Sequence, residues 1–159
     1  MELDYKLICM DLDGTLLDIK HKINPYTLDI LNKLEKKGIK LAIATGRDGF
    51  DAKHHAQIVS DECYYIGSNG AVVGESNHNK LLAENVIAIE DISKVLEFAK
   101  DQVIAFGDSE NDREMLKFVG LGIAMENASA SIKSIADQVT LKNTDDGVAK
   151  KLEELFFLT

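Results

Sequence analysis

Residues 8–18 read ICMDLDGTLLD, an apolar run that ends abruptly in two aspartates separated by one leucine. The run shows no alternation of polar and apolar residues, which is typical of a strand buried on both faces of a parallel sheet. Asp11 and Asp13 then fall at the carboxyl-terminal edge of the sheet, where such folds bind their ligands. This stretch predicts both the class of fold and the place of its site.

Similar short apolar runs recur along the rest of the chain. Between them lie segments in which apolar residues have the spacing of a helix. The clearest helix is predicted over residues 27–38, TLDILNKLEKKG, whose apolar positions share one face and whose Gly38 closes the last turn. The alternation predicts an α/β fold, a doubly wound, Rossmann-like, mostly parallel sheet with helices on both faces. Strands are expected at 6–12, 40–45, 63–68, 103–107, 121–125 and 138–141, and further helices at 48–59, 91–100, 110–118, 129–136 and 147–156.

Length and composition limit the classes of protein that remain. The 159 residues suit a single domain over residues 1–159, and 45% hydrophobic with 28% charged residues is a globular composition. The net charge of −9 argues against nucleic acid or an anionic membrane as a partner. No apolar run approaches the roughly 18 residues that span a bilayer, and the first residues lack a secretory signal. We therefore expect a cytoplasmic protein.

A second acidic group follows the apolar run VIAFG, where GDSENDREM opens a predicted helix. The plain alternative is that Asp108 or Ser109 is an ordinary N-cap and that the acidic residues, Asp112 among them, complement the helix dipole. Two acidic groups on parallel strands meet at one edge of the sheet, however, and this favours a metal cage. Neighbouring carboxylates repel unless a proton or a cation lies between them, and hard divalent ions prefer oxygen ligands. The pattern predicts a Mg²⁺ site.

Two further polar motifs follow predicted strands. In LAIATGRD, Thr45, Gly46 and Arg47 place a hydroxyl, an unhindered N–H and a helix start together, which can cradle a phosphate. Thr-Gly is also a common turn, and Arg47 either reaches substrate or pairs with a nearby acid. In YIGSNGAVV, Asn69 is placed to hydrogen-bond a substrate, although an Asn-Gly hairpin turn explains it equally well.

The motifs DLDGTLLD, ATGR, SNGA and GDSENDREML, with the run from VGLGIAMENA to GVAKKLEEL, resemble the haloacid dehalogenase superfamily and its Cof-like sugar-phosphatase branch. The resemblance covers nearly the whole chain. It implies a Mg²⁺-dependent phosphohydrolase that acts on small phosphorylated metabolites, such as sugar phosphates, through a covalent aspartyl-phosphate intermediate.

By position, the resemblance implies that Asp11 is the nucleophile and Asp13 the general acid/base. Asp108 is then a side-chain ligand of Mg²⁺ together with Asp11 and the carbonyl of Asp13. The other residues it implies are Thr45 and Gly46 for the transferring phosphoryl group, and Asn111 and Asp112 for the metal and substrate end. Arg47 and Asn69 stay candidate substrate-binding residues on the grounds given above.

The sequence departs from this branch between Asn69 and Asp108. The branch carries a cap domain inserted after the strand that ends in NGA, and the interval here is too short to hold one. We expect residues 71–100 to be its remnant, a hairpin with its turn at GESN (residues 74–77) followed by one helix. Loss of a cap exposes apolar surface in this segment. We therefore expect the protein to form a homo-oligomer, a dimer or tetramer, in which this segment of one subunit packs on another.

The resemblance also implies a lysine that binds the phosphoryl group from the helix before the second acidic motif. Lys94 has the family's local setting but stands closer to Asp108 than the family's spacing, and Lys100 is the other candidate. Lysines on helices are usually solvated. The alternative function is therefore a catalytically impaired phosphate- and Mg²⁺-binding domain. A response-regulator receiver domain is disfavoured because its acceptor aspartate lies on a middle strand.

Overall fold

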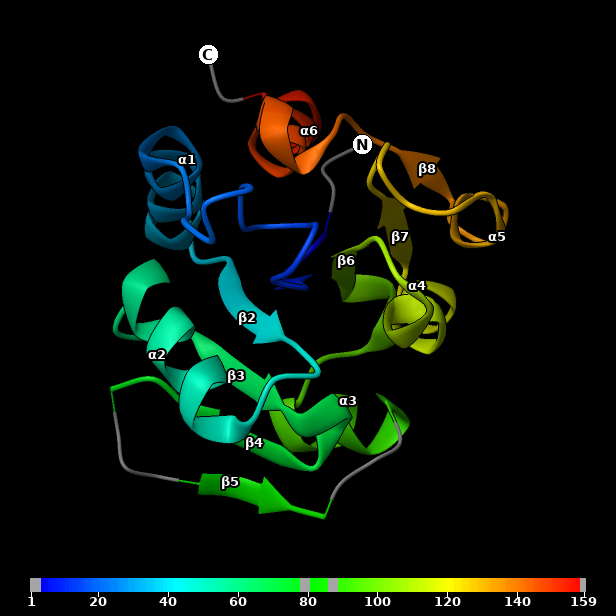
Figure 1. Ribbon diagram of the computed structural model, residues 1–159. Coiled ribbons are helices and arrows are strands. Elements are labelled where there is room, and N and C mark those ends of the chain that lie inside the picture. Colours follow the sequence, from blue (N-terminus) through cyan, green and yellow to red (C-terminus); the bar gives the residue numbers. More distant parts are fainter. Residues whose placement is uncertain (1–3, 78–80, 86–88, 158–159) are drawn as a thin grey trace.

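The computed structural model describes residues 4–77, 81–85 and 89–157. Within these residues one sheet has the strand order β5-β4-β3-β2-β1-β6-β7-β8 (Figure 1). All neighbours are parallel except β3 with β4 and β4 with β5. The strands are β1 (Leu7–Met10), β2 (Lys40–Ala44), β3 (Tyr64–Gly67), β4 (Val72–Glu75), β5 (Leu81–Glu84), β6 (Val103–Gly107), β7 (Leu121–Ala124) and β8 (Gln138–Val139). The predicted doubly wound α/β fold is confirmed.

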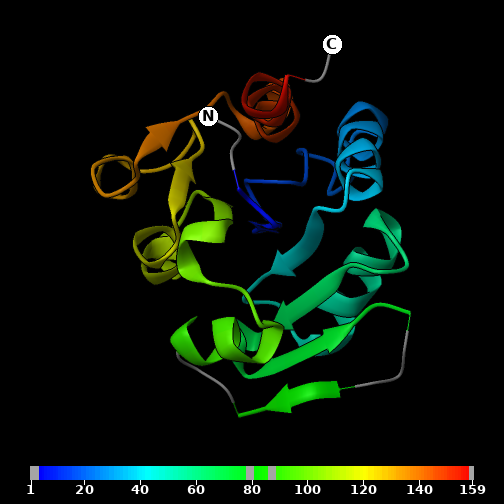
Figure 2. The same cartoon turned by 180° about the vertical axis from the view of Figure 1, so that it is seen from behind.

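Helices cover both faces of this sheet (Figures 1 and 2). One face packs against α1 (Pro25–Lys36), α2 (Gly49–Val59) and α6 (Gly147–Phe156). The other face packs against α3 (Ile89–Leu96), α4 (Arg113–Phe118) and α5 (Ala130–Lys133). Four single turns complete the fold: η1 (Ser68–Gly70), η2 (Lys100–Gln102), η3 (Glu110–Asp112) and η4 (Asn143–Asp145). None of the described helices is long and apolar enough to cross a membrane.

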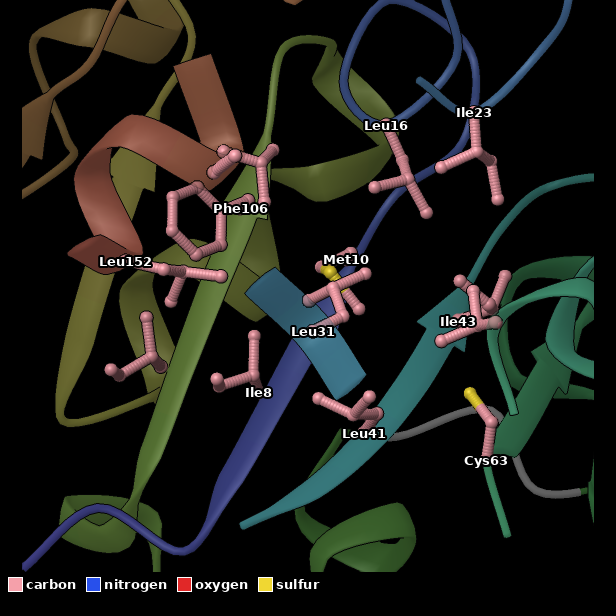
Figure 3. Close-up of a cluster of buried hydrophobic side chains, with 14 of the residues drawn as sticks. Ile8, Met10, Leu16, Ile23, Leu31, Leu41, Ile43, Cys63, Phe106 and Leu152 are labelled. Atoms are coloured by element: carbon pink, nitrogen blue, oxygen red, sulfur yellow. The ribbon is translucent and has the colours of Figure 1, made fainter. Parts of the chain in front are cut away.

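The central strand β1 shows why the apolar run lacks alternation. Ile8 and Met10 pack toward α1 and α6, whereas Leu7 and Cys9 pack toward α3 and α4. Figure 3 shows the first of these cores, where Ile8 and Met10 lie among side chains from neighbouring strands and helices. Each fully buried aliphatic side chain contributes roughly 1.5–3 kcal/mol. Burial on both sides therefore anchors the strand that ends in Asp11.

The helix α1 begins two residues before its predicted start, because Asn24 caps it. The Asn24 side chain accepts a hydrogen bond from the Tyr26 N–H over 2.9 Å, and Pro25 occupies the first turn. The predicted apolar face is buried, and Gly38 follows the helix with a φ of 89°. Capping and periodicity thus agree on this helix.

Several predicted boundaries differ from the structure, and two of the differences fall in residues 71–100. The helix expected over 91–100 ends at Leu96, because Glu97 adopts a left-handed φ of 59° and a separate turn, η2, follows. The hairpin turn expected at residues 74–77 lies later, because Gly74 and Glu75 belong to β4. Gly74 pairs with Tyr65, whose ring covers it so closely that a Cβ there would lie 2.4 Å from the phenol oxygen. Residues 78–80 of this hairpin lie outside the described residues.

Candidate functional site

An acidic cluster lies at the carboxyl-terminal edge of the central strands. Asp11 follows β1 and Asp108 follows β6, and these strands are neighbours in the sheet. Asp112 joins them from the turn η3. One carboxylate oxygen from each of the three residues lies within 4.8 Å of the other two. Asp11 and Asp112 are buried, at 8% and 5% exposure. The two acidic motifs therefore meet as predicted.

Backbone N–H groups orient Asp112. Its Oδ2 accepts hydrogen bonds from the N–H of Asp108 over 2.9 Å and of Ser109 over 3.0 Å. The Ser109 hydroxyl donates to the same oxygen over 3.3 Å. These three bonds all end on Oδ2 of Asp112 and hold its carboxylate in place within the cluster.

Asp108 is held from the loop after β1. The Thr15 hydroxyl donates a hydrogen bond to Asp108 Oδ1 over 3.0 Å. Gly14 lies against the other oxygen with a φ of +82°, and a Cβ there would come within 2.3 Å of Asp108 Oδ2. Only glycine allows this approach of the loop to the carboxylate.

The electrostatics of the cluster call for a cation. Burial, together with repulsion from Asp112 and Asp108, raises the pKa of Asp11 to about 9. Burial also raises the pKa of Asp108 and Asp112. No lysine, arginine or histidine among the described residues forms an ion pair with any of the three. Three clustered carboxylates, two of them buried, with no counter-charge among the described residues fit a hard divalent ion such as Mg²⁺.

Asp13 is placed differently, although only Leu12 separates it from Asp11. Its side chain is 49% exposed and pairs with Arg47, which donates from Nε to Oδ2 over 2.7 Å and from Nη2 to Oδ1 over 2.6 Å. This hydrogen bonding lowers the pKa of Asp13. Arg47 also bonds Asp51 over 2.8 Å. Of the two predicted roles for Arg47, the structure has the pairing with a nearby acid.

The loop after β2 forms the floor of a cavity beside the cluster. Thr45 is buried, and its hydroxyl oxygen accepts a hydrogen bond from the Arg47 N–H over 3.2 Å. Gly46 lies under two amides, because a Cβ there would be 3.1 Å from Asn69 Oδ1 and 3.4 Å from Asn111 Nδ2. Together with Asp112 these residues line a cavity of about 100 Å³. Four of the predicted phosphate- and substrate-binding residues thus line one space next to the carboxylates: Thr45, Gly46, Asn69 and Asn111. The fifth, Arg47, does not line it.

Asn69 reaches this cavity through an unusual turn. Ser68, Asn69 and Gly70 all have positive φ, at 51°, 53° and 97°. The turn is tied to the loop after β2, since the Ser68 N–H donates to the Arg47 carbonyl over 2.6 Å and the Asn69 N–H to the Thr45 carbonyl over 3.2 Å. The Asn-Gly pair therefore forms the turn before β4 and also presents an amide to the cavity.

The structure does not bring the candidate lysines to the cluster. Lys94 is 78% exposed and pairs with Asp91 over 3.1 Å. Lys100 is exposed in the turn η2. The helix α3 instead approaches the cavity with Ile92, which lines its wall.

Two asparagines that sequence reasoning missed support the loop that carries Gly14. Asn127 donates from Nδ2 to the Gly14 carbonyl over 2.7 Å and accepts at Oδ1 from the Asn143 N–H over 3.1 Å. Asn143 donates from Nδ2 to the Leu17 carbonyl over 2.8 Å. The signal available was their position, since polar residues directly follow two more strands at the same edge.

Comparison with known families gives one clear match. The family model of the haloacid dehalogenase-like hydrolases matches residues 8–102 and, in a second overlapping segment, residues 86–152. The two segments include every residue of the acidic cluster and the cavity.

Curated relatives from Bacillus subtilis (strain 168) are phosphatases by name. The 5-amino-6-(5-phospho-D-ribitylamino)uracil phosphatase YitU is 35% identical over 104 residues, which cover 65% of this chain and 37% of the relative. YcsE, of the same name, is 25% identical over 95% of this chain and 96% of the relative. That alignment spans 238 positions, more than the 159 residues of this chain. The chain thus spans little more than a third of the first relative and lacks an internal stretch of the second.

Solved structures share the fold. A haloacid dehalogenase-like hydrolase from Bacteroides thetaiotaomicron superposes with a TM-score of 0.89 at 20% identity, over 96% of this chain and 100% of that one. The identity is low, so this likeness concerns the arrangement of the backbone.

Proposed function

Because this chain belongs to the haloacid dehalogenase-like hydrolases, we propose that it hydrolyses phosphate monoesters of small metabolites at the acidic cluster. The observation that carries the proposal is that the carboxylate cluster lies directly beside a cavity with a neutral, hydrogen-bonding lining. Two buried carboxylates, Asp11 and Asp112, and the half-buried Asp108 lie beside a cavity lined by Thr45, Gly46 and two side-chain amides. The cluster supplies a nucleophile and metal ligands, and the cavity supplies neutral hydrogen-bond donors for phosphoryl oxygens.

In the proposed reaction an oxygen of Asp11 attacks phosphorus, and the bond between phosphorus and the ester oxygen breaks. Asp13 donates a proton to the departing alkoxide. Asp13 then takes a proton from water, whose oxygen attacks the phosphorus of the aspartyl-phosphate. Inorganic phosphate leaves and Asp11 is regenerated, so the atoms and charges balance.

The pair with Arg47 bears on the role of Asp13. The guanidinium lowers the pKa of Asp13 and keeps it ionised, which suits the base of the second step. For the first step Asp13 must take up a proton and leave Arg47. Arg47 therefore favours the ionised form of Asp13, which the second step needs, over the protonated form, which the first step needs.

Asp11, Asp108, Asp112 and the carbonyl of Asp13 are the groups we propose to hold Mg²⁺. The ion would supply positive charge that offsets repulsion between Asp11 and a dianionic phosphoryl group. Removal of the ion with a chelator is expected to abolish turnover.

We also propose that the protein acts in the cytoplasm.

A second candidate function is phosphate and Mg²⁺ binding without turnover. The exposed position of Lys94 and its pair with Asp91 favour it, because no lysine among the described residues then lines the cavity for the phosphoryl group. We propose that residues 71–100, which form β4, β5 and α3, stand where capped relatives carry an insertion. The family match divides within this region, into residues 8–102 and 86–152, which supports this assignment.

Turnover of p-nitrophenyl phosphate with and without Mg²⁺ separates the two functions. We expect release of nitrophenol that requires Mg²⁺ and is absent from Asp11→Asn. A matched control is Glu154→Gln, which removes one carboxylate from α6, far along the chain from the cluster. Binding of inorganic phosphate without any turnover would instead establish the second function.

A further inference from the structure

The cavity beside the acidic cluster has two kinds of wall. Asp112 belongs to both the cluster and the cavity, so the cavity opens directly onto the carboxylates. Thr45 and Gly46 directly follow β2, at the same edge of the sheet as the carboxylates. Ile66, Ile92 and Met115 form an apolar wall of the cavity, and they also line a second, smaller apolar space beneath α3. A leaving group that extends into this cavity from a phosphoryl group at Thr45 and Gly46 lies against this apolar wall.

No lysine or arginine lines the cavity in the part of the chain that the structure describes. Its charged lining residues are Asp112 and Glu114. Glu114 lies exposed in the first turn of α4, at the rim. The nearest arginine in sequence, Arg113, pairs with Glu110 over 2.7 and 2.9 Å. Arg47 is likewise engaged, with Asp13 and Asp51. A second anionic group in this cavity therefore finds no counter-charge.

We propose that this site selects substrates whose leaving group carries no negative charge, and that Glu114 is the side chain that discriminates. This inference rests on the proposed function, since it concerns the leaving group of the same reaction. A carboxylate or second phosphate in this cavity meets Glu114 at the rim and apolar carbons along the wall. A hydroxyl is tolerated there, and an ammonium group is attracted to Glu114.

Two matched pairs of sugar phosphates isolate the charge of the leaving group. Glucosamine 6-phosphate and glucose 6-phosphate are both rings and differ by an ammonium in place of a hydroxyl. Glucitol 6-phosphate and 6-phosphogluconate are both open chains and differ by a carboxylate in place of a hydroxymethyl group. We expect kcat/KM to be about threefold higher for glucosamine 6-phosphate and about tenfold lower for 6-phosphogluconate, each relative to its partner.

Glu114→Gln removes the discriminating charge and keeps the shape of the side chain. We expect it to shrink both ratios by about threefold. Glu154→Gln loses the same charge on α6, away from the cavity, and should leave both ratios unchanged. Raising the salt concentration should shrink the wild-type ratios in the same direction, because Glu114 is exposed and its field is screened.

The outcomes separate this inference from the proposed function. Turnover of all four esters with equal or reversed ratios overturns the selectivity and leaves the phosphatase in place. Ratios that Glu154→Gln shrinks as much as Glu114→Gln would attribute the selectivity to net charge and overturn the role of Glu114. If none is turned over, the proposed phosphatase fails, and calorimetric dissociation constants for the same pairs take the place of kcat/KM. Weaker binding of 6-phosphogluconate than of glucitol 6-phosphate then supports the selectivity, and equal binding overturns it.

Discussion

The acidic edge of the central strands and residues 71–100 differ in how firmly the fold holds them. Every residue of β1, β6 and β7 is buried, and the acidic residues that follow β1 and β6 inherit their positions from this core. At the far side of the sheet β5 forms an edge, with half-exposed residues and Leu81 at 41% exposure (Figure 1). The helix α3, which follows it, carries Lys94 on its exposed side.

This difference separates two parts of one active site. Each buried aliphatic side chain of these strands contributes roughly 1.5–3 kcal/mol to the stability of the fold that positions the carboxylates. Single changes of a carboxylate should therefore alter the chemistry before they alter the fold. Lys94, the candidate cation in residues 71–100, is 78% exposed and is not positioned by buried neighbours in this way. The comparison predicts large effects of changes at the acidic edge and small ones in the segment.

The largest effect is expected for Asp11→Asn. Loss of the nucleophile should lower phosphatase turnover by on the order of 10³-fold or more. The fold should survive, because the amide fills the same space and relieves repulsion with Asp108 and Asp112. Turnover of p-nitrophenyl phosphate and circular dichroism measure the two expectations. A variant that retains wild-type turnover would contradict the assignment of the nucleophile.

Asp108→Ala should act on the metal first. We expect the Mg²⁺ concentration for half-maximal activity to rise by roughly 10- to 100-fold, with part of the activity restored at high Mg²⁺. Titration of Mg²⁺ against turnover checks this. A titration curve that matches wild type would show that Asp108 only caps the turn that follows it.

A homo-oligomer is our next expectation, and it tests the edge segment. We propose that a dimer or tetramer covers the exposed side of β5, where Leu81 presents apolar surface. Light scattering at micromolar concentration should give a multiple of the monomer mass, and Leu81→Lys should lower it. A monodisperse wild-type monomer would refute the assembly.

The pH dependence of stability without metal sharpens the contrast. The pKa of Asp11 is raised from 3.8 to about 9 in the folded protein. Between these values the folded chain holds a proton that the unfolded chain has released, so this group lowers stability progressively as pH rises from about 4 to about 9. In a chelator the Tm of Asp11→Asn should exceed that of wild type by several degrees at pH 8, and by less at pH 5.

Added Mg²⁺ should close this gap, because the ion binds the folded wild-type cluster and not the unfolded chain. Thermal melts at pH 5 and pH 8, with chelator or with Mg²⁺, measure all four conditions. A gap that is independent of pH would mean that Asp11 is ionised in the metal-free fold.

The smallest effects are expected at the lysines. Lys94 is exposed and pairs with Asp91, so Lys94→Ala and Lys100→Ala should each change kcat by less than about threefold. Lys100→Ala is the control for general loss of positive charge. A strong loss confined to Lys94→Ala would show that the segment brings this lysine to the phosphoryl group during turnover.

Local sequence alone was enough to predict the acidic edge. Apolar runs that lack alternation identify strands buried on both faces, and parallel strands must align their carboxyl ends. The encounter of Asp11 with Asp108 follows from these two facts without any knowledge of side-chain contacts. The start and face of α1 were readable for a similar reason, because periodicity and capping act within a few residues of each other.

Tertiary structure alone decided what lies around that edge. Asp11 and Asp13 are indistinguishable as residue types, yet one is buried among carboxylates and the other is paired with Arg47 from a different strand loop. The place of Gly74 in β4 depends on the ring of Tyr65, and the support of Gly14 depends on Asn127. The exposure of Lys94 depends on how α3 packs on α4. Each of these contacts joins residues distant in the chain, and their burial and dielectric environment exist only once the strands and helices have packed.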